Sequence, residues 1–306
     1  MAFAAMRRAR ASRLAVVCSV DLPGFLNHGK RSKIRVERKP MDEMKQISLK
    51  NHAQHIQGAD SCAVCRDGAE LGFDFSYAFQ PIVDIRARRV FAHEALIRGV
   101  GGESALSVLE RVTPANRYQF DQACRVRAIK TASGVGVQSR LSINFLPNAI
   151  YRPEVCIKTT LQAAETYGFP IEKIIFETVE GERIDDGKWL AEVFREYQRI
   201  GFSTAIDDFG AGYAGLNLLA DFQPDLIKLD MGLIRDIDKR KTNRVIVAAV
   251  VGICAELGIR VIAEGVETRD ELLCLQDIGI ELIQGYLLSK PLFEGSIADA
   301  NLVLPM

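Results

Sequence analysis

From Tyr77 onward, short β-rich runs alternate with segments of helical period, and this alternation limits the chain to few folds. The expected strands cover residues 77–85, 90–98, 141–147, 173–180, 203–209, 225–230, 260–267 and 282–290. The expected helices lie near 104–112, 117–133, 154–168, 187–200, 214–221, 239–257 and 268–279. Only the segment Arg86–Arg89 separates the first two strands, which is too short for a parallel crossover and predicts an antiparallel hairpin. We therefore expect an α/β fold, a (β/α)8 TIM-like barrel with an antiparallel first strand.

The amino-acid composition limits which partners and surroundings are expected for such a barrel. Lys and Arg total 39, equal to the total of Asp and Glu, so the bulk charge does not suggest a nucleic-acid polymer as partner. No apolar run is long enough to span a membrane, so membrane insertion is not expected. The seven cysteines are scattered and odd in number, which favours reduced thiols and a cytoplasmic location over a disulfide framework.

The chain before the barrel has a different composition. Residues 1–49 are strongly basic, and we expect 1–70 to be a mostly disordered segment and 71–306 to form the barrel. His52 and His55 precede a CxxC pair, Cys62 and Cys65, and together they offer four ligands of the kind that Zn²⁺ takes. The gap between the two pairs is short for a zinc finger. A Zn²⁺ site, a redox thiol pair and no special role therefore all stay open, and the last is favoured.

Polar side chains gather where the expected strands end, and TIM-like barrels carry their chemistry at those ends. These residues are Glu94 and Arg98, Asn144, Glu177 and Glu180, Asp207 and Asp208, Lys228 and Asp230, Glu264 and Glu267, and Gln284. A single acid at a strand end is usually a helix N-cap or part of a surface ion pair. Acids at many neighbouring strand ends would repel one another without cations, so the whole set indicates a metal site.

The chemistry of the candidate ligands limits which metal ions the site can bind. The ring of strand ends contains no Cys or His, and oxygen ligands alone suit Mg²⁺, Mn²⁺ or Ca²⁺. There are more acids than one Mg²⁺ needs, so two ions per site are expected. Two-metal sites carry out in-line displacement at phosphorus.

Asp207 and Asp208 pose a geometric problem, because consecutive side chains on a strand point to opposite faces. We expect the strand to end at this point, so that both carboxylates can turn toward the barrel mouth. Three glycines follow within the next seven residues and would let the loop curl over the site.

The motifs of this chain resemble those of the EAL domain, the cyclic-di-GMP phosphodiesterase family. The signature itself is Glu94-Ala95-Leu96. The other matching segments, in the family's order, are FQPIVD (79–84), NFLP (144–147), FETVE (176–180), DDFGAGYAGL (207–216), PDLIKLD (224–230), VIAEGVET (261–268) and QGYLLSKP (284–291). The resemblance covers about residues 73–296, and it implies metal-dependent hydrolysis of the bacterial second messenger cyclic-di-GMP to linear 5′-pGpG.

The resemblance also implies a role for each site residue. Two Mg²⁺ or Mn²⁺ ions would be held by Glu94, Asn144, Glu177, Asp207, Asp208 and Glu264. Lys228 would contact the attacking water as general base, its pKa depressed by the ions, with Glu94, Asp208 and Gln284 as further catalytic residues. Gln80, Arg98 and Asp230 would contact the dinucleotide or its metal, and Glu180 and Glu267 would anchor the loop 209–215 and a neighbouring strand end.

Departures from the family pattern keep an alternative function open. Ala211, Ala214 and Gly215 stand where the family often has Thr, Ser and Ser. These changes could weaken the order of the loop without removing a metal ligand. The alternative is therefore a weak or inactive EAL domain that acts as a cyclic-di-GMP receptor or a protein-interaction module. The resemblance further implies a homodimer formed through helices beside strands five and six.

Overall fold

The computed structural model describes residues 71–150, 152–179, 187–211 and 215–304. Several predictions made above fall outside these ranges. They are the N-terminal segment 1–70, the zinc or thiol role of His52, His55, Cys62 and Cys65, the anchoring role of Glu180, and the effect of Ala214.

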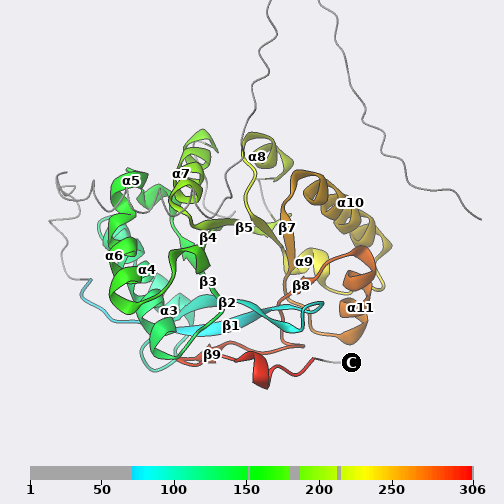
Figure 1. Cartoon of the computed structure of the whole chain (residues 1–306), viewed down its shortest axis with the longest axis horizontal. Helices are drawn as coiled ribbons and strands as arrows, with labels where there is room; N and C mark the ends of the chain where they lie inside the picture. The colour runs from blue at the N-terminus through cyan, green and yellow to red at the C-terminus, as the bar shows by residue number, and fades with distance from the viewer. Residues whose placement is uncertain (1–70, 151, 180–186, 212–214, 305–306) are drawn as a thin grey trace, which may run out of the picture. The chain divides into compact units, whose positions relative to one another are not determined.

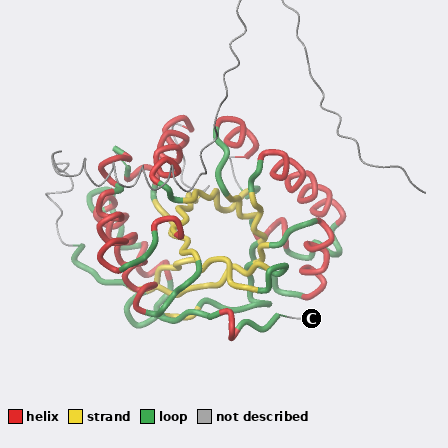
Figure 2. Tube along the Cα trace, viewed as in Figure 1, coloured by secondary structure: helices red, strands yellow, loops and turns green. Residues whose placement is uncertain are grey.

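A closed ring of strands forms the centre of the structure (Figure 2). Its members are β1 (Ser76–Asp84), β2 (Arg89–Arg98), β3 (Arg140–Phe145), β4 (Ile174–Val179), β5 (Ser203–Phe209), β6 (Leu226–Leu229), β7 (Arg260–Ala263) and β8 (Leu282–Ile283). Strands β2 to β8 are parallel, whereas β1 pairs antiparallel with both β2 and β8 and closes the ring. The predicted barrel with an antiparallel first strand is confirmed.

Helices cover most of the outside of the ring, and β9 lies along β1, as Figure 1 shows. They are α3 (Ala105–Leu109), α4 (Arg117–Gly134), α5 (Pro153–Cys156), α6 (Lys158–Tyr167), α7 (Gly187–Ile200), α8 (Gly215–Asp221), α9 (Met231–Ile234), α10 (Lys241–Leu257) and α11 (Arg269–Ile278). The helix expected at 154–168 is split into α5 and α6, and the short helix α9 was not expected. Helix α9 forms because Asp230 caps it, its Oδ1 accepting a hydrogen bond from the Gly232 N–H at 2.8 Å. In the described residues, no helix combines the length and apolarity that a membrane span needs.

The end of the barrel differs from the expectation. The strand expected at 282–290 ends at Ile283, because the chain then turns against the loop after β7. A Cβ atom on Gly285 would lie 2.0 Å from the Val266 carbonyl oxygen, so only glycine fits this turn. After the turn, β9 (Leu292–Phe293) pairs antiparallel with β1, an addition that the sequence pattern did not predict.

The layer between strands and helices is aromatic and encloses an ion pair. Arg125 of α4 is fully buried and contacts Asp121 one turn earlier at 2.7 Å. Its guanidinium also donates to the Tyr197 hydroxyl at 2.8 Å and lies 5.1 Å from the Phe176 ring centroid. Asp121 in turn accepts a hydrogen bond from the Leu146 N–H at 2.9 Å, which ties α4 to the loop after β3.

Candidate active site at the barrel mouth

The two-residue period of the strands builds the mouth of the barrel. Every strand except β3 places an apolar side chain in an inner layer: Ile82, Ala92, Ile175, Ala205, Leu226, Ile262 and Leu282. Two residues closer to the mouth, a polar residue stands on each of these strands or directly after it: Gln80, Glu94, Glu177, Asp207, Lys228, Glu264 and Gln284. Ser142 and Asn144 occupy the same two positions on β3. The apolar layer is therefore the floor beneath a polar ring.

Lys228 lies among the carboxylates of this ring. Its Nζ is 2.6 Å from Glu264 Oε1, 3.0 Å from Asp207 Oδ1, 3.1 Å from Glu177 Oε2 and 3.2 Å from Glu94 Oε2. The side chains of Lys228 and Glu177 are almost completely removed from solvent, each with 1% of its surface exposed. One ammonium therefore faces four carboxylates, which leaves an excess of negative charge in a poorly solvated place.

Burial and the neighbouring charges shift the pKa values of the ring. Burial raises the pKa of Glu177 to about 8; Glu94 and Asp207 contribute to the rise, and Lys228 opposes it. Burial, with Asp207 and Glu94, also raises the pKa of Glu264 well above its ordinary value. Burial lowers the pKa of Lys228, but its carboxylate neighbours outweigh this and raise it well above the usual range. A depressed pKa of Lys228, as expected above, would require further positive charge at the ring.

Asp207 and Asp208 both line the mouth. Strand β5 covers Ser203–Phe209, the range expected for it, so the strand continues one residue past the two acids instead of ending at them. Its register with β6 shifts between Ile206 and Phe209, and Asp208 has a φ of 54°. This bulge, with a left-handed residue, breaks the alternation of faces and aims both carboxylates at one space. Burial, Asp207 and Asp230 together raise the pKa of Asp208 to about 6.

The donor set fits divalent cations. Ligand oxygens of Glu94, Glu177 and Asp207 lie within 4.8 Å of one another, and so do those of Asp207, Asp208 and Glu264. Asp207 belongs to both groups. Asn144 Oδ1 is buried without a hydrogen-bond partner in the described residues, while its Nδ2 donates to Glu94 Oε1 at 3.4 Å. A buried acceptor without a donor beside three carboxylates is the arrangement that an oxygen-preferring cation satisfies.

Gln284 and Ser142 orient two of the carboxylates by hydrogen bonds. Gln284 Nε2 donates to Glu94 Oε2 at 2.6 Å and to Gln80 Oε1 at 3.3 Å. The hydroxyl of Ser142 donates to Glu177 Oε1. Ser142 was missed at the sequence level, although it precedes Asn144 by two residues and so shares its face of β3.

The cavity at the mouth has a volume of about 350 Å³. Its lining comprises Gln80, Glu94, Asp207, Asp208, Lys228, Asp230, Met231, Glu264, Gly265, Glu267, Gln284, Gly285 and Tyr286. Met231 and Tyr286 were also missed, and both are exposed apolar side chains beside the acids. Their positions directly after Asp230 and Gly285, two loop residues of the site, were the available signal.

Two of the sequence-predicted residues lie elsewhere or have further partners. Arg98 stands four residues beyond Glu94 on β2, does not line the cavity, and donates to the carbonyl of Ile97 at 2.7 Å. Glu267 lines the cavity but forms an exposed ion pair with Arg235 at 2.7 Å, so its contact is with the end of α9. The predicted anchoring role of Glu267 and substrate contact of Arg98 remain predictions.

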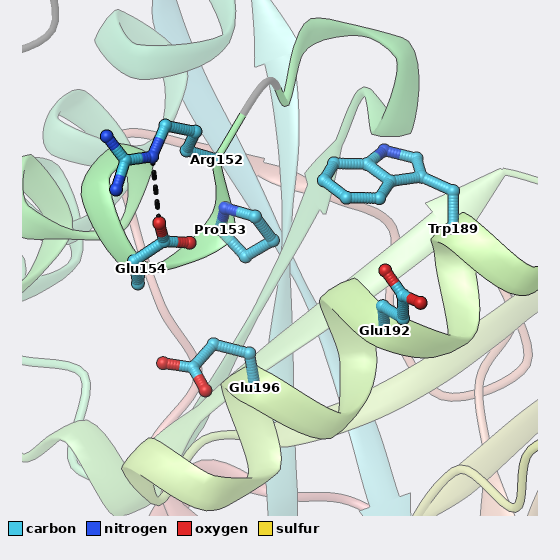
Figure 3. A pocket seen from close by; sticks show the side chains of 6 residues that line it. All are labelled: Arg152, Pro153, Glu154, Trp189, Glu192 and Glu196. Carbon is cyan, nitrogen blue, oxygen red and sulfur yellow. Dashed lines mark hydrogen bonds and ion pairs between the residues drawn. The ribbon is translucent and has the colours of Figure 1, made fainter.

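A second cavity of about 470 Å³, shown in Figure 3, lies on the outside of the barrel between α5 and α7. It contains Trp189 and three glutamates. Two of these are already paired: Glu154 with Arg152 at 2.9 Å and Glu196 with Arg199 at 2.7 Å. This cavity therefore lacks the cluster of carboxylates around one buried cation that distinguishes the mouth.

Comparison with known proteins agrees with this site. Residues 69–291 match the EAL domain. The chain belongs to the EAL domain family. The resemblance drawn from the motifs is thus confirmed. The EAL barrel is similar to a standalone versatile EAL protein from Vibrio cholerae O395 in its c-di-GMP bound form, with 52% identity and a TM-score of 0.73 over 75% of this chain and 97% of that one. It is also similar to Klebsiella pneumoniae BlrP1 in complex with manganese and cyclic-di-GMP, with 38% identity and a TM-score of 0.68 over 72% of this chain and 56% of that one.

Two longer relatives have names that describe different functions, an antirepressor and a phosphodiesterase. BluF of Escherichia coli K12, a blue light- and temperature-regulated antirepressor, is 34% identical over 251 residues, which are 78% of this chain and 62% of BluF. The cyclic di-GMP phosphodiesterase PA2567 of Pseudomonas aeruginosa is 29% identical over 240 residues, 76% of this chain and 40% of that protein. The chain thus spans less than two thirds of the length of either relative.

Proposed function

We propose that this EAL domain hydrolyses cyclic-di-GMP to linear 5′-pGpG with two Mg²⁺ or Mn²⁺ ions. The observation that carries the proposal is the presence of two clusters of acidic residues, Glu94, Glu177 and Asp207, and Asp207, Asp208 and Glu264. Asp207 belongs to both clusters, and the unpartnered Asn144 Oδ1 lies beside them. The relative named as a cyclic di-GMP phosphodiesterase and the manganese complex of BlrP1 support it.

The ring offers ligands for two ions. Glu94, Asn144, Glu177 and Asp207 would hold the first, and Asp207, Asp208 and Glu264 the second. When bound, such ions supply activation of water and neutralisation of charge on the phosphoryl oxygens. The same ions would oppose both the burial and the neighbouring carboxylates, which together raise the pKa of Glu177 and Glu264.

The remaining lining residues bind, orient and move a proton. The four carboxylates raise the pKa of Lys228, and positive charge at the ring would lower it again. Lys228 Nζ can then accept the proton of the attacking water. Gln284 orients Glu94 by its hydrogen bond, and Gln80 presents an amide to the cavity. Tyr286, 58% exposed, and Met231, 45% exposed, supply an apolar wall against which a guanine base can lie. Asp230 adds a further carboxylate to the lining, beside the proposed ligands of the second ion.

A homodimer through α10 belongs to the proposal. This helix follows β6, and the side chains of Val245, Ala249, Ile253 and Leu257 on it are exposed at four-residue spacing. Residues four apart lie on one face of a helix, so they form a continuous apolar stripe. A second copy of the same stripe would remove it from water. A cytoplasmic location is proposed as well, on the scattered and odd-numbered cysteines.

The alternative function is a cyclic-di-GMP receptor with little or no turnover. The observation that favours it is the loop after β5, where Ala211 is exposed and its side chain has no polar atom. The name of BluF, an antirepressor, supports instead the other form of the alternative, a protein-interaction module. The enzyme and the receptor bind the same ligand, so only turnover distinguishes those two.

The deciding experiment incubates the purified chain with cyclic-di-GMP and Mg²⁺ or Mn²⁺ and follows pGpG by chromatography. We expect product with at least one metal and none in EDTA. Glu94→Ala removes a proposed metal ligand, which also accepts from Gln284 and contacts Lys228. This variant should lower turnover at least ~1000-fold.

The matched control is Glu165→Ala, an exposed glutamate on α6 that does not line the mouth, which should keep wild-type turnover. Tight binding of cyclic-di-GMP without product in either metal would replace the enzyme proposal with the receptor.

A further inference from the structure

A cavity of about 660 Å³ lies at the end of the barrel opposite the carboxylates. Its wall includes Arg89 and Arg140, which are the first residues of β2 and β3, and Lys173, which directly precedes β4. The same three strands carry ring residues at their other ends, so this cavity and the mouth are separated by the apolar floor.

The chain segment after β9 forms one wall of this cavity and is held in place by hydrogen bonds. The Val90 N–H donates to Asp299 Oδ1 at 2.7 Å, and the Ile297 N–H donates to His93 Nε2 at 3.3 Å. Because Nε2 accepts, Nδ1 of His93 carries the ring proton and donates to Ser139 Oγ at 2.8 Å. The wall is therefore tied to β2 at two points, and the cavity is preformed.

Arg140 is one of three cations that line this cavity. It is half-buried, and its guanidinium carbon lies 4.8 Å from the centroid of the Phe91 ring. In the described part of the chain, no acceptor forms a hydrogen bond or ion pair with this guanidinium. By contrast, Arg260 lies on the same ring at 4.4 Å and has Asp84 as partner at 3.4 Å.

Other positive charges surround Arg140. Burial lowers the pKa of the Arg140 guanidinium, and Arg260 and Arg89 lower it further, while Asp225 acts in the opposite direction. Like charges gathered at a half-buried place cost free energy that an anion between them would offset.

The wall also contains two acids. Asp299 uses one carboxylate oxygen to accept the Val90 N–H, and Glu172 is exposed beside Lys173. The cations Arg89, Arg140 and Lys173 outnumber them. Lys173 donates one hydrogen bond, to the Gln138 carbonyl at 2.7 Å, and has two further N–H groups.

We infer that this cavity is a second ligand site that binds a phosphate group, with Arg140 as its anchor and Arg89 and Lys173 as further donors. A guanidinium fork matches the geometry of a phosphate, and an ammonium adds a point charge. The volume lies within the range of pockets that hold small molecules, so the phosphate can be inorganic or belong to a nucleoside monophosphate. This site is independent of the proposed hydrolysis at the mouth.

Isothermal titration calorimetry on the full chain tests the site, with inorganic phosphate and 5′-GMP as two probes. The buffer contains EDTA, because without divalent cations the carboxylates at the mouth repel both anions. We expect binding of at least one probe by the wild type. Tighter binding of 5′-GMP assigns the site to nucleotides, and equal binding assigns it to the phosphate alone.

The variants locate the binding. Arg140→Gln should weaken it roughly tenfold or more, and Arg89→Gln should weaken it by a smaller factor. Arg269→Gln, an exposed arginine on α11, is the matched control and should bind as the wild type does. Because Arg89 is exposed, its replacement cannot act through loss of the fold. Absence of binding of both probes by the wild type, or wild-type binding by Arg140→Gln and Arg89→Gln, would overturn the inference.

Discussion

Lys228 is the residue on which the charge balance of the mouth depends. Within the described chain it is the cation that contacts four acids of the ring: Glu94, Glu177, Asp207 and Glu264. Removal of one partner from a buried ionic cluster leaves the others without compensation. The gathering of polar residues at the strand ends predicted that Lys228 lies at the mouth. It did not predict contact with four carboxylates, since those stand on, or directly after, four different strands.

Lys228→Met should therefore destabilise the protein in EDTA by about 3 kcal/mol and abolish turnover. Mn²⁺ should raise the melting temperature of Lys228→Met more than that of the wild type, because the ions then supply the only compensating charge at the ring. Thermal melting with EDTA and with Mn²⁺ measures both effects. Equal melting temperatures of the two proteins in EDTA would contradict this account of the ring.

At the scale of elements, α4 is joined to the barrel by the buried pair Asp121 and Arg125. Asp121→Asn should cost about 3 kcal/mol, because it leaves the Arg125 charge in an aromatic layer without a counter-charge. The double variant Asp121→Leu/Arg125→Met removes both charges and should recover most of this loss. Urea unfolding of the three proteins gives the comparison. If the double variant is as unstable as Asp121→Asn, the charge is not the cause.

The turn after β8 is a second element-scale feature. Gly285→Ala should cost about 2 kcal/mol, since its Cβ would lie 2.0 Å from the Val266 oxygen and 2.4 Å from the Val266 nitrogen. Gly252→Ala in α10 is the matched control, because a Cβ there meets no atom within 4 Å. That substitution should stabilise the protein by about 0.5–1 kcal/mol through helix propensity. Differential scanning calorimetry should give melting shifts of opposite sign; shifts of the same sign would rule out the close approach at Gly285.

At the scale of the whole molecule, the apolar stripe on α10 predicts the state of assembly. Val245 and Ile253 are 60% and 38% exposed, which is costly for β-branched apolar side chains in a monomer. The double variant Val245→Glu/Ile253→Glu should shift the protein from dimer to monomer, as measured by sedimentation velocity. Leu273→Glu on α11, also an exposed apolar position, should leave the dimer intact. A monomeric wild type at micromolar concentration would refute the proposed dimer.

The sequence by itself determined the barrel and most of its ring. The alternation of strand and helix patterns counts eight strands, and the two-residue period assigns Glu94, Glu177, Lys228 and Gln284 to one face at one end. These features are local, because they depend only on residues a few positions apart in the chain. Ser142 could have been found by the same period.

Only the tertiary structure decided which of these side chains touch. The contact of Lys228 with four acids depends on the closure of the barrel and on the register between strands. The bulge at Asp208 depends on the pairing of β5 with β6, and the position of Arg98 outside the cavity depends on the length of β2 beyond Glu94. The unpaired Arg140 likewise became visible only when β2, β3 and the segment after β9 were brought together. Distances between strands are set by packing across the whole barrel, and a sequence pattern contains no measure of them.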